Sequence, residues 1–203
     1  MRRTTSSRPH SQLYSRLSCA GLIRRTLRSV VAPNSLPVRR FVLPQGLKGQ
    51  ENGKLSPDLL VAIRPSGFLY KTAAASYHAM KKAAKDDGIV LKPTSAFDAY
   101  RPYSVQEAVF LQRYTKTPLP GRPTRTWNGA TWYLKPGLAP LASPGTSNHG
   151  WACACDIWNV GQNGRLEWLL ANAERFGWSW EVQSEPWHIR YCLGDRLSDG
   201  VTL

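Results

Sequence analysis

The sequence predicts one domain of mixed α and β structure, because segments with helical periodicity are combined with shorter segments typical of strands. Of the 203 residues, 42% are hydrophobic and eight are Trp, which is enough apolar material for a compact core. Helices are expected at 72–88, 104–114 and 164–177, and strands at 153–158, 178–182 and 188–192.

The first predicted helix, 72–88, follows from the spacing of its apolar residues. Tyr77, Met80 and Ala84 fall on one side of an Ala-rich segment, and Gly88 is a typical stop. We expect this side to be buried.

The other two helices are predicted mainly from their ends. Ser104 and Glu107 have the spacing of a capping box at the start of 104–114. Four apolar residues of 164–177 are spaced for one buried face, and Gly177 ends the pattern. A further helix start is expected at Ser56, which is followed by Pro and Asp.

The strand segments are short and rich in β-branched and aromatic residues. Residues 89–97 are expected to form a strand that leads into a loop, because Pro93 interrupts it. About thirty residues between Tyr114 and Ser147 contain six prolines and three aromatic residues. Loops of this length are usually functional or disordered, so we interpret the segment as a packed lid or a substrate wall, with a merely structural loop as the alternative.

The basic charge is concentrated at the N-terminus. The formal net charge is +14, yet residues 1–48 hold ten Lys and Arg and no Asp or Glu, which leaves 17 basic against 13 acidic residues elsewhere. We therefore expect a basic, disordered extension at 1–48 and a folded domain at 49–203, with a chain that starts near Gly49 still able to fold.

Other interpretations of the extension are a targeting segment, an anchor for anionic polymer or lipid, and a nucleic-acid arm. Nucleic-acid binding is disfavoured for the domain, since the basicity that suggests it belongs to the extension. No apolar run is long enough for a transmembrane helix or for a convincing secretory signal.

Three histidines lie beyond the extension, and two of them are near acidic residues. His78 sits on a predicted helix among alanines, where an exposed, non-ligating histidine is expected. His149 is followed by Asp156, and His188 is preceded by Glu185. Catalytic zinc sites use three protein ligands and keep one position open, with a general base nearby. These four residues supply such a set, although a histidine and an acidic residue at either of these two spacings often occur by chance.

Three motifs resemble those of VanY-like D-alanyl-D-alanine carboxypeptidases and related peptidoglycan peptidases. SNHGWACACD at 147–156 resembles S-x-H-G-x-G-x-A-x-D, EPWH at 185–188 resembles E-x-W-H, and AYRPYSVQ at 99–106 resembles a Y-R-x-x-x-x-Q segment. Together they cover roughly 50–195 in the order of the family. One departure is Ala152, where the family usually has Gly; its methyl group could tighten the turn after His149.

The resemblance implies a zinc (Zn2+) site and roles for its neighbours. The three implied metal ligands are His149, Asp156 and His188. Zinc would polarise the scissile carbonyl and acidify a water, and Glu185 would pass the proton of that water to the leaving amine. The implied substrate contacts are Arg101, Gln106 and Ser147. Arg101 would bind a substrate carboxylate or the oxyanion, or else only pair with Asp98, and Ser147 would bind the terminal carboxylate or hold its loop.

The resemblance also implies fold and function. The fold is an α+β domain like that of Hedgehog and D,D-peptidases, with a small, mainly antiparallel sheet that carries the ligands and helices packed on it. The favoured function is a zinc peptidase of peptidoglycan stem peptides that removes terminal D-Ala and acts at the cell wall, where the basic extension would be attracted to anionic polymer. The alternatives are an L-alanyl-D-glutamate endopeptidase of the phage endolysin type and a non-catalytic zinc-containing binding domain.

The two cysteines inside the metal motif are expected to point away from the metal. Side chains alternate along a strand, so Asp156 and Ala154 share one face while Cys153 and Cys155 share the other. We interpret both thiols as small buried hydrophobic groups, with a thiolate or redox role as the alternative. Cys192 has the parity of His188 but lies about 13 Å along a strand, too far to be a ligand.

Overall fold

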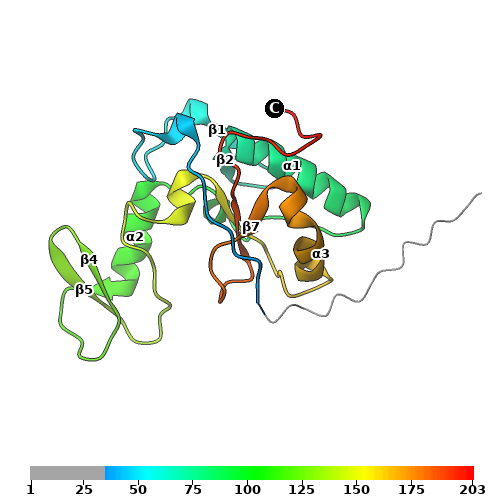
Figure 1. Cartoon of the computed structure of the whole chain (residues 1–203). Helices are drawn as coiled ribbons and strands as arrows, with labels where there is room; N and C mark the ends of the chain where they lie inside the picture. The colour runs from blue at the N-terminus through cyan, green and yellow to red at the C-terminus, as the bar shows by residue number, and fades with distance from the viewer. Residues whose placement is uncertain (1–34) are drawn as a thin grey trace, which may run out of the picture. The chain divides into compact units, whose positions relative to one another are not determined.

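The computed structural model describes residues 35–203, so residues 1–34 of the basic extension expected at 1–48 lie outside the described residues (Figure 1). The described residues, 35–203, belong to one compact unit. Within the described part, no helix has the length and apolar character needed to cross a bilayer.

The sheet that carries the site has three antiparallel strands in the order β6–β8–β7. They are β6 (Ala154–Asp156), β7 (Trp178–Trp180) and β8 (His188–Tyr191), which confirms the three predicted strands. β8 is central and all four of its residues are buried. Asp156 is the direct register partner of His188, so two predicted ligands from distant parts of the sequence are neighbours across the sheet.

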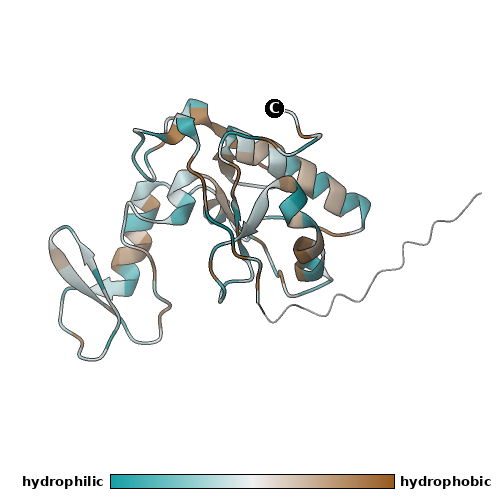
Figure 2. Ribbon diagram, in the orientation of Figure 1, coloured by the Kyte–Doolittle hydropathy of each residue, from teal (hydrophilic) through white to brown (hydrophobic). Residues whose placement is uncertain are grey.

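Three α-helices accompany this sheet: α1 (Lys71–Asp86), α2 (Tyr103–Arg113) and α3 (Arg165–Asn172), the last extended by a 3-10 turn over Ala173–Phe176. As predicted, Tyr77, Met80 and Ala84 of α1 are fully buried. Tyr77 meets Trp178 of β7 edge to face, with ring centroids 6.0 Å apart. Figure 2 shows hydrophobic and hydrophilic residues side by side on the helices, as amphipathic packing requires. The α+β class is confirmed.

Three of the local signals are not followed by the structure. α2 begins after Pro102 without a side-chain cap, and the N–H of Tyr103 donates instead to the carbonyl of Gly53 at 2.7 Å, so the predicted capping box is wrong. The helix start at Ser56 gives only a 3-10 turn, Pro57–Leu59. Residues 89–97 form no strand; a single bridge joins Pro93 to Ile157, because proline has no N–H to extend the pairing.

The segment expected as a long loop contains a second small sheet with the order β3–β5–β4. Its strands are β3 (Tyr114–Thr115), β4 (Thr124–Trp127) and β5 (Ala130–Leu134), and it lies beside the end of α2 (Figure 1). Asn128 and Gly129 both have positive φ, 49° and 68°, which is the two-residue hairpin turn that Asn-Gly favours. This dipeptide is the signal in the sequence that could have predicted the hairpin.

A third sheet, which precedes α1, has two strands, β1 (Leu60–Ala62) and β2 (Phe68–Tyr70), and they form an antiparallel hairpin. The N–H of Tyr70 donates to the carbonyl of Ala152 at 2.8 Å. This bond ties the start of α1 to the turn that follows His149.

Residues 35–48, expected within the extension, pack along the edge of the central sheet. Val38 bridges Trp180 in parallel, and the N–H of Arg39 donates to the Trp180 carbonyl at 2.9 Å. Phe41 packs against the core, and Leu47 is fully buried. The boundary expected at residue 49 therefore lies inside packed structure. We call residues 35–48 the N-terminal strap.

Candidate metal centre and substrate pocket

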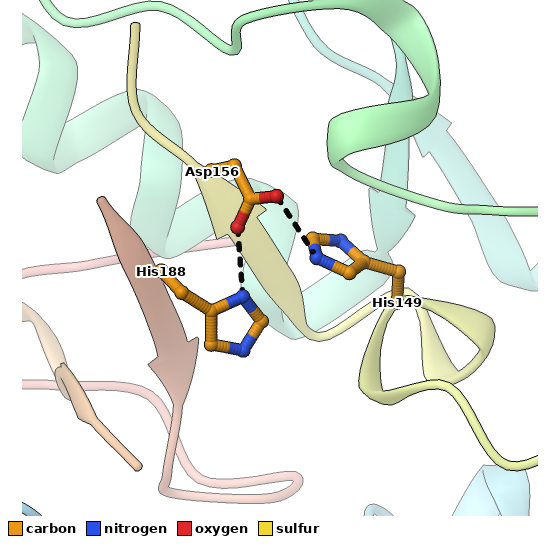
Figure 3. A group of neighbouring side chains, drawn as sticks. All are labelled: His149, Asp156 and His188. Atoms are coloured by element: carbon orange, nitrogen blue, oxygen red, sulfur yellow. Dashed lines mark hydrogen bonds and ion pairs between the residues drawn. The ribbon is translucent and has the colours of Figure 1, made fainter. Parts of the chain in front are cut away.

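The three predicted zinc ligands meet at one point. His149 lies on the 3-10 turn Asn148–Trp151, Asp156 ends β6, and His188 begins β8. Figure 3 shows Asp156 between the two imidazoles, with Oδ1 2.7 Å from His188 Nδ1 and Oδ2 3.3 Å from His149 Nε2. One nitrogen of each ring and one carboxylate oxygen lie within 4.8 Å of one another, and this is the metal-ligating group found among residues 35–203.

The remaining ring nitrogens have acceptors, which fits a metal site. His149 Nδ1 lies 2.9 Å from the carbonyl of Ala99, and His188 Nε2 lies 2.8 Å from Glu181 Oε1. A ligating histidine typically donates its other N–H to such an acceptor, and this fixes both the tautomer and the ring orientation. Two imidazole nitrogens and one carboxylate are a typical donor set for catalytic zinc.

The electrostatics of the centre favour a cation. Burial opposes ionisation of Asp156, but hydrogen bonds from His149 and His188 outweigh it and hold the pKa of Asp156 below its usual range. Burial also opposes the charge on His188, yet the hydrogen bonds to Asp156 and Glu181 raise the pKa of His188 to about 9. In the metal-free chain, a protonated imidazole thus occupies the place between two carboxylates where positive charge is stabilised.

Ala152, the departure from the family motif, adopts the left-handed conformation, with φ 53° and ψ 28°. Its N–H donates to the carbonyl of His149 at 3.1 Å and closes the turn. An L-residue in this region costs roughly 1–2 kcal/mol, a cost that glycine avoids. Ala152 therefore carries a backbone cost, whereas the tightening of the turn by its methyl group stays a prediction.

A buried amide network, which sequence reasoning missed, supports the His149 turn. Asn52 Nδ2 donates to the carbonyl of Ser147 at 2.8 Å, and Gln106 Nε2 donates to Asn52 Oδ1 at 3.2 Å. A Cβ on Gly150 would lie 2.0 Å from Asn52 Oδ1. No local pattern could indicate Asn52, because its partners are 54 and 95 residues away.

The three predicted substrate contacts line one pocket beside the metal centre. Arg101, Gln106 and Ser147 share it with Leu141 and Ala142, which belong to the segment interpreted as a lid or wall. The N–H of Arg101 donates to the carbonyl of His149 at 3.1 Å, which places the pocket next to a predicted ligand.

The polar atoms of this pocket are partly engaged within the chain. Arg101 Nη2 lies 3.2 Å from Asp98 Oδ1, and its Nε donates to the carbonyl of Phe97 at 3.1 Å. The ion pair with Asp98, given as the alternative, therefore coexists with the position in the pocket. Gln106 donates to the carbonyl of Arg101 and accepts from the N–H of Gly145, both at 2.9 Å, so its amide holds the pocket walls together.

Glu185 lies in the turn before β8 and is half-buried. Its carbonyl accepts from the N–H of His188 at 3.0 Å. Among residues 35–203 its carboxylate has no hydrogen bond or ion pair, in contrast to Glu181, which holds His188. The general-base role of Glu185 stays a prediction.

The cysteines lie away from the metal centre. Cys153 and Cys155 are fully buried in the hydrophobic core, which confirms the parity prediction. Burial raises the pKa of Cys153 to about 12 and that of Cys155 well above its usual value. Cys192 is also buried and lies outside the ligating group, and His78 is exposed, as expected.

A family model described as VanY, D-alanyl-D-alanine carboxypeptidase, matches residues 67–195, which is more than half of the chain. No curated protein sequence matches the chain.

Several solved structures are similar to the chain. The LD-carboxypeptidase LdcB is 23% identical, with a TM-score of 0.47, and the match covers 68% of this chain and 70% of that one. VanYB in complex with D-alanine-D-alanine is 23% identical, with a TM-score of 0.45 and coverage of 65% and 76%. A mutant of the vancomycin resistance D,D-pentapeptidase VanY in complex with Zn(II) is 21% identical, with a TM-score of 0.45 and coverage of 77% and 85%.

Proposed function

Because the chain belongs to the VanY family of D-alanyl-D-alanine carboxypeptidases, we propose that its metal centre and adjoining pocket together remove the terminal D-Ala of peptidoglycan stem peptides. The enzyme is a zinc metallopeptidase. The observation that carries the proposal is the position of Arg101 and Ser147 in a pocket whose wall is bonded to the backbone of His149.

His149, Asp156 and His188 are the residues that would hold zinc, which supplies Lewis-acid polarisation of the scissile carbonyl and acidifies a water. Glu185 would accept the proton of the attacking water and return it to the leaving amine. Its half-buried turn is bonded to the start of β8, and this attachment supports the role.

Arg101 is proposed to bind the free carboxylate at the end of the substrate. Asp98 and the carbonyl of Phe97 use only two of the five guanidinium N–H groups and hold the side chain in place. The other N–H groups can pair with a carboxylate, and a fixed guanidinium loses little freedom when it does so. Such a contact requires the scissile bond to lie one residue from the chain end.

The test compares a stem pentapeptide with its C-terminal amide. The parent enzyme should release D-Ala from the acid and be roughly 10- to 150-fold slower with the amide, because a charge-assisted hydrogen bond contributes about 1.5–3 kcal/mol. In Arg101→Met this preference should largely disappear through a loss of acid turnover. Lys92→Met, which removes a cation stacked on Trp158 instead, is the control and should keep the preference.

Equal turnover of acid and amide by the parent, with free L-Ala as the new terminus, would replace this proposal with the endopeptidase. A preference for the acid that survives Arg101→Met would assign the carboxylate contact to another residue.

The base assignment has its own test. Glu185→Gln should keep zinc and lose hydrolysis, since the amide fills the same space but cannot accept the proton. Glu167→Gln, on the exposed side of α3, is the control and should behave as the parent. Parent-like activity of Glu185→Gln would exclude Glu185 as the base.

We also propose that the basic N-terminal residues attract anionic cell-wall polymer. Residues 1–34 carry seven Arg and no acidic residue. Their removal should weaken binding to cell walls at low salt while leaving hydrolysis of soluble peptides unchanged. Unchanged cell-wall binding at low salt would contradict the attraction.

A further inference from the structure

His188 lies between two carboxylates that come from the two neighbouring strands. On one side Asp156 is its register partner in β6. On the other side β7 pairs with β8 through Trp180 opposite Ile189, and Glu181 is the next residue after β7. Continuing the same register places Glu181 opposite His188, and residues directly opposite each other share one face of a sheet.

The two carboxylates contact different nitrogens of the same ring. Asp156 Oδ1 lies 2.7 Å from Nδ1, the nitrogen on the side of the metal centre, and Glu181 Oε1 lies 2.8 Å from Nε2. Both edges of the imidazole are therefore held, and the ring has no freedom to turn about its χ angles without breaking a bond.

Glu181 is itself fixed by two further donors. Its carboxylate pairs with Arg190, two residues after His188, and accepts from the side chain of Asn148, the neighbour of His149. The Arg190 guanidinium stacks 3.4 Å from the ring centroid of Phe41 in the N-terminal strap. One partly buried carboxylate thus connects the strap, β8 and the turn that carries His149.

Resting on the zinc assignment made above, we propose that Glu181 is a positioning residue for the metal: it holds His188 in the tautomer and orientation that present Nδ1 to zinc. Accepting the Nε2–H leaves the Nδ1 lone pair free for the metal, and the negative charge makes that lone pair more basic. Glu181 touches neither the metal side of the ring nor the substrate pocket, so its effect passes through His188.

The experiment measures zinc affinity of the full chain by competition with a chromophoric chelator, which needs no knowledge of the substrate. Glu181→Ala should weaken zinc binding by about 10- to 100-fold. Glu181→Gln should fall between this variant and the parent, since an amide oxygen still accepts the N–H but carries no charge. Glu174→Ala is the matched control, because it removes a carboxylate that pairs with the strap residue Arg39 at the surface. Its zinc affinity should equal that of the parent.

Two more measurements separate positioning from mere support of the fold. The visible absorption of the cobalt-substituted chain should change in Glu181→Ala, because it reports the geometry of the ligands. Unfolding of the metal-free variants measures the loss of stability on its own. Lower stability with parent-like zinc affinity and an unchanged cobalt spectrum would overturn the proposal. If Glu181→Ala does not fold, Glu181→Gln decides, and zinc affinity within about twofold of the parent would count against Glu181. Zinc affinity is measured without substrate, so its result does not depend on whether the enzyme hydrolyses stem peptides. The Glu181 proposal and the carboxypeptidase proposal can therefore fail separately.

Discussion

Gly150→Ala tests whether the buried amide network positions the first zinc ligand. A Cβ at residue 150 would lie 2.0 Å from Asn52 Oδ1 and 2.7 Å from Gln106 Nε2, far inside van der Waals contact. Neither amide can simply turn aside, because Asn52 also bonds the carbonyl of Ser147 and Gln106 also bonds the N–H of Gly145.

The expected cost follows from these contacts. Relieving the overlap displaces Asn52 and breaks its two buried hydrogen bonds, each with a net value of about 1 kcal/mol, and leaves at least one buried polar group unpaired at about 1–3 kcal/mol. We expect the free energy of unfolding to fall by about 2–4 kcal/mol. For a domain of this size this corresponds to a decrease in Tm of roughly 5–15 °C.

The assay combines thermal unfolding of the metal-free chain with a zinc titration. Zinc affinity should fall at least about tenfold, because the carbonyl of Gly150 is bonded to Gly53 and the displaced turn carries His149. Gly161→Ala is the matched control, since nothing lies within 4 Å of a Cβ at that position. It should leave stability and zinc affinity unchanged.

A double variant isolates the overlap. In an Asn52→Ala background the additional cost of Gly150→Ala should shrink, because the oxygen at 2.0 Å is gone, although Gln106 keeps part of it. Gly150→Ala with parent-like Tm and zinc affinity would refute the reasoning. Strictly additive effects of the two substitutions would show that the cost has another origin.

Three further predictions follow from the described contacts. Zinc affinity should rise with pH up to about 9 and then level off, because zinc displaces the proton of His188, whose pKa is about 9 without metal. A zinc affinity that stays constant between pH 6 and 10 in chelator competition would contradict this. Cys153 and Cys155 should resist a thiol reagent at pH 8 until the chain unfolds, because burial raises their pKa values. The double Ala variant should keep zinc while losing roughly 1 kcal/mol or more of stability. Labelling of the folded chain, or loss of metal in the double variant, would argue against core packing. A chain starting at residue 35 should keep the parent Tm, whereas a chain starting at residue 49 should have a lower Tm, since it lacks the buried Leu47. Equal Tm values for the two truncated chains would show that the strap adds no stability.

The sequence by itself determined the features that repeat with a local period or stand in a short motif. Helical spacing predicted the buried side of α1, and strand alternation placed Cys153 and Cys155 on the face opposite Asp156. The buried side of the helix and the alternation along the strand both follow from the local backbone geometry of the segment. The predicted metal ligands also came from short motifs, because the 3-10 turn and the two strands that present them are contiguous with the motif residues.

Only the tertiary structure decided which distant groups support that site. Asn52, Glu181 and the strap residue Phe41 belong to no motif, and each acts through a partner brought to it by strand register or by packing. The capping box of α2 failed for the same reason, since the helix begins one residue before Ser104, at Tyr103, whose N–H donates to the carbonyl of Gly53 in a distant loop. Hydrogen bonds of this kind depend on the position of the partner in space, and a local pattern contains no information about that position.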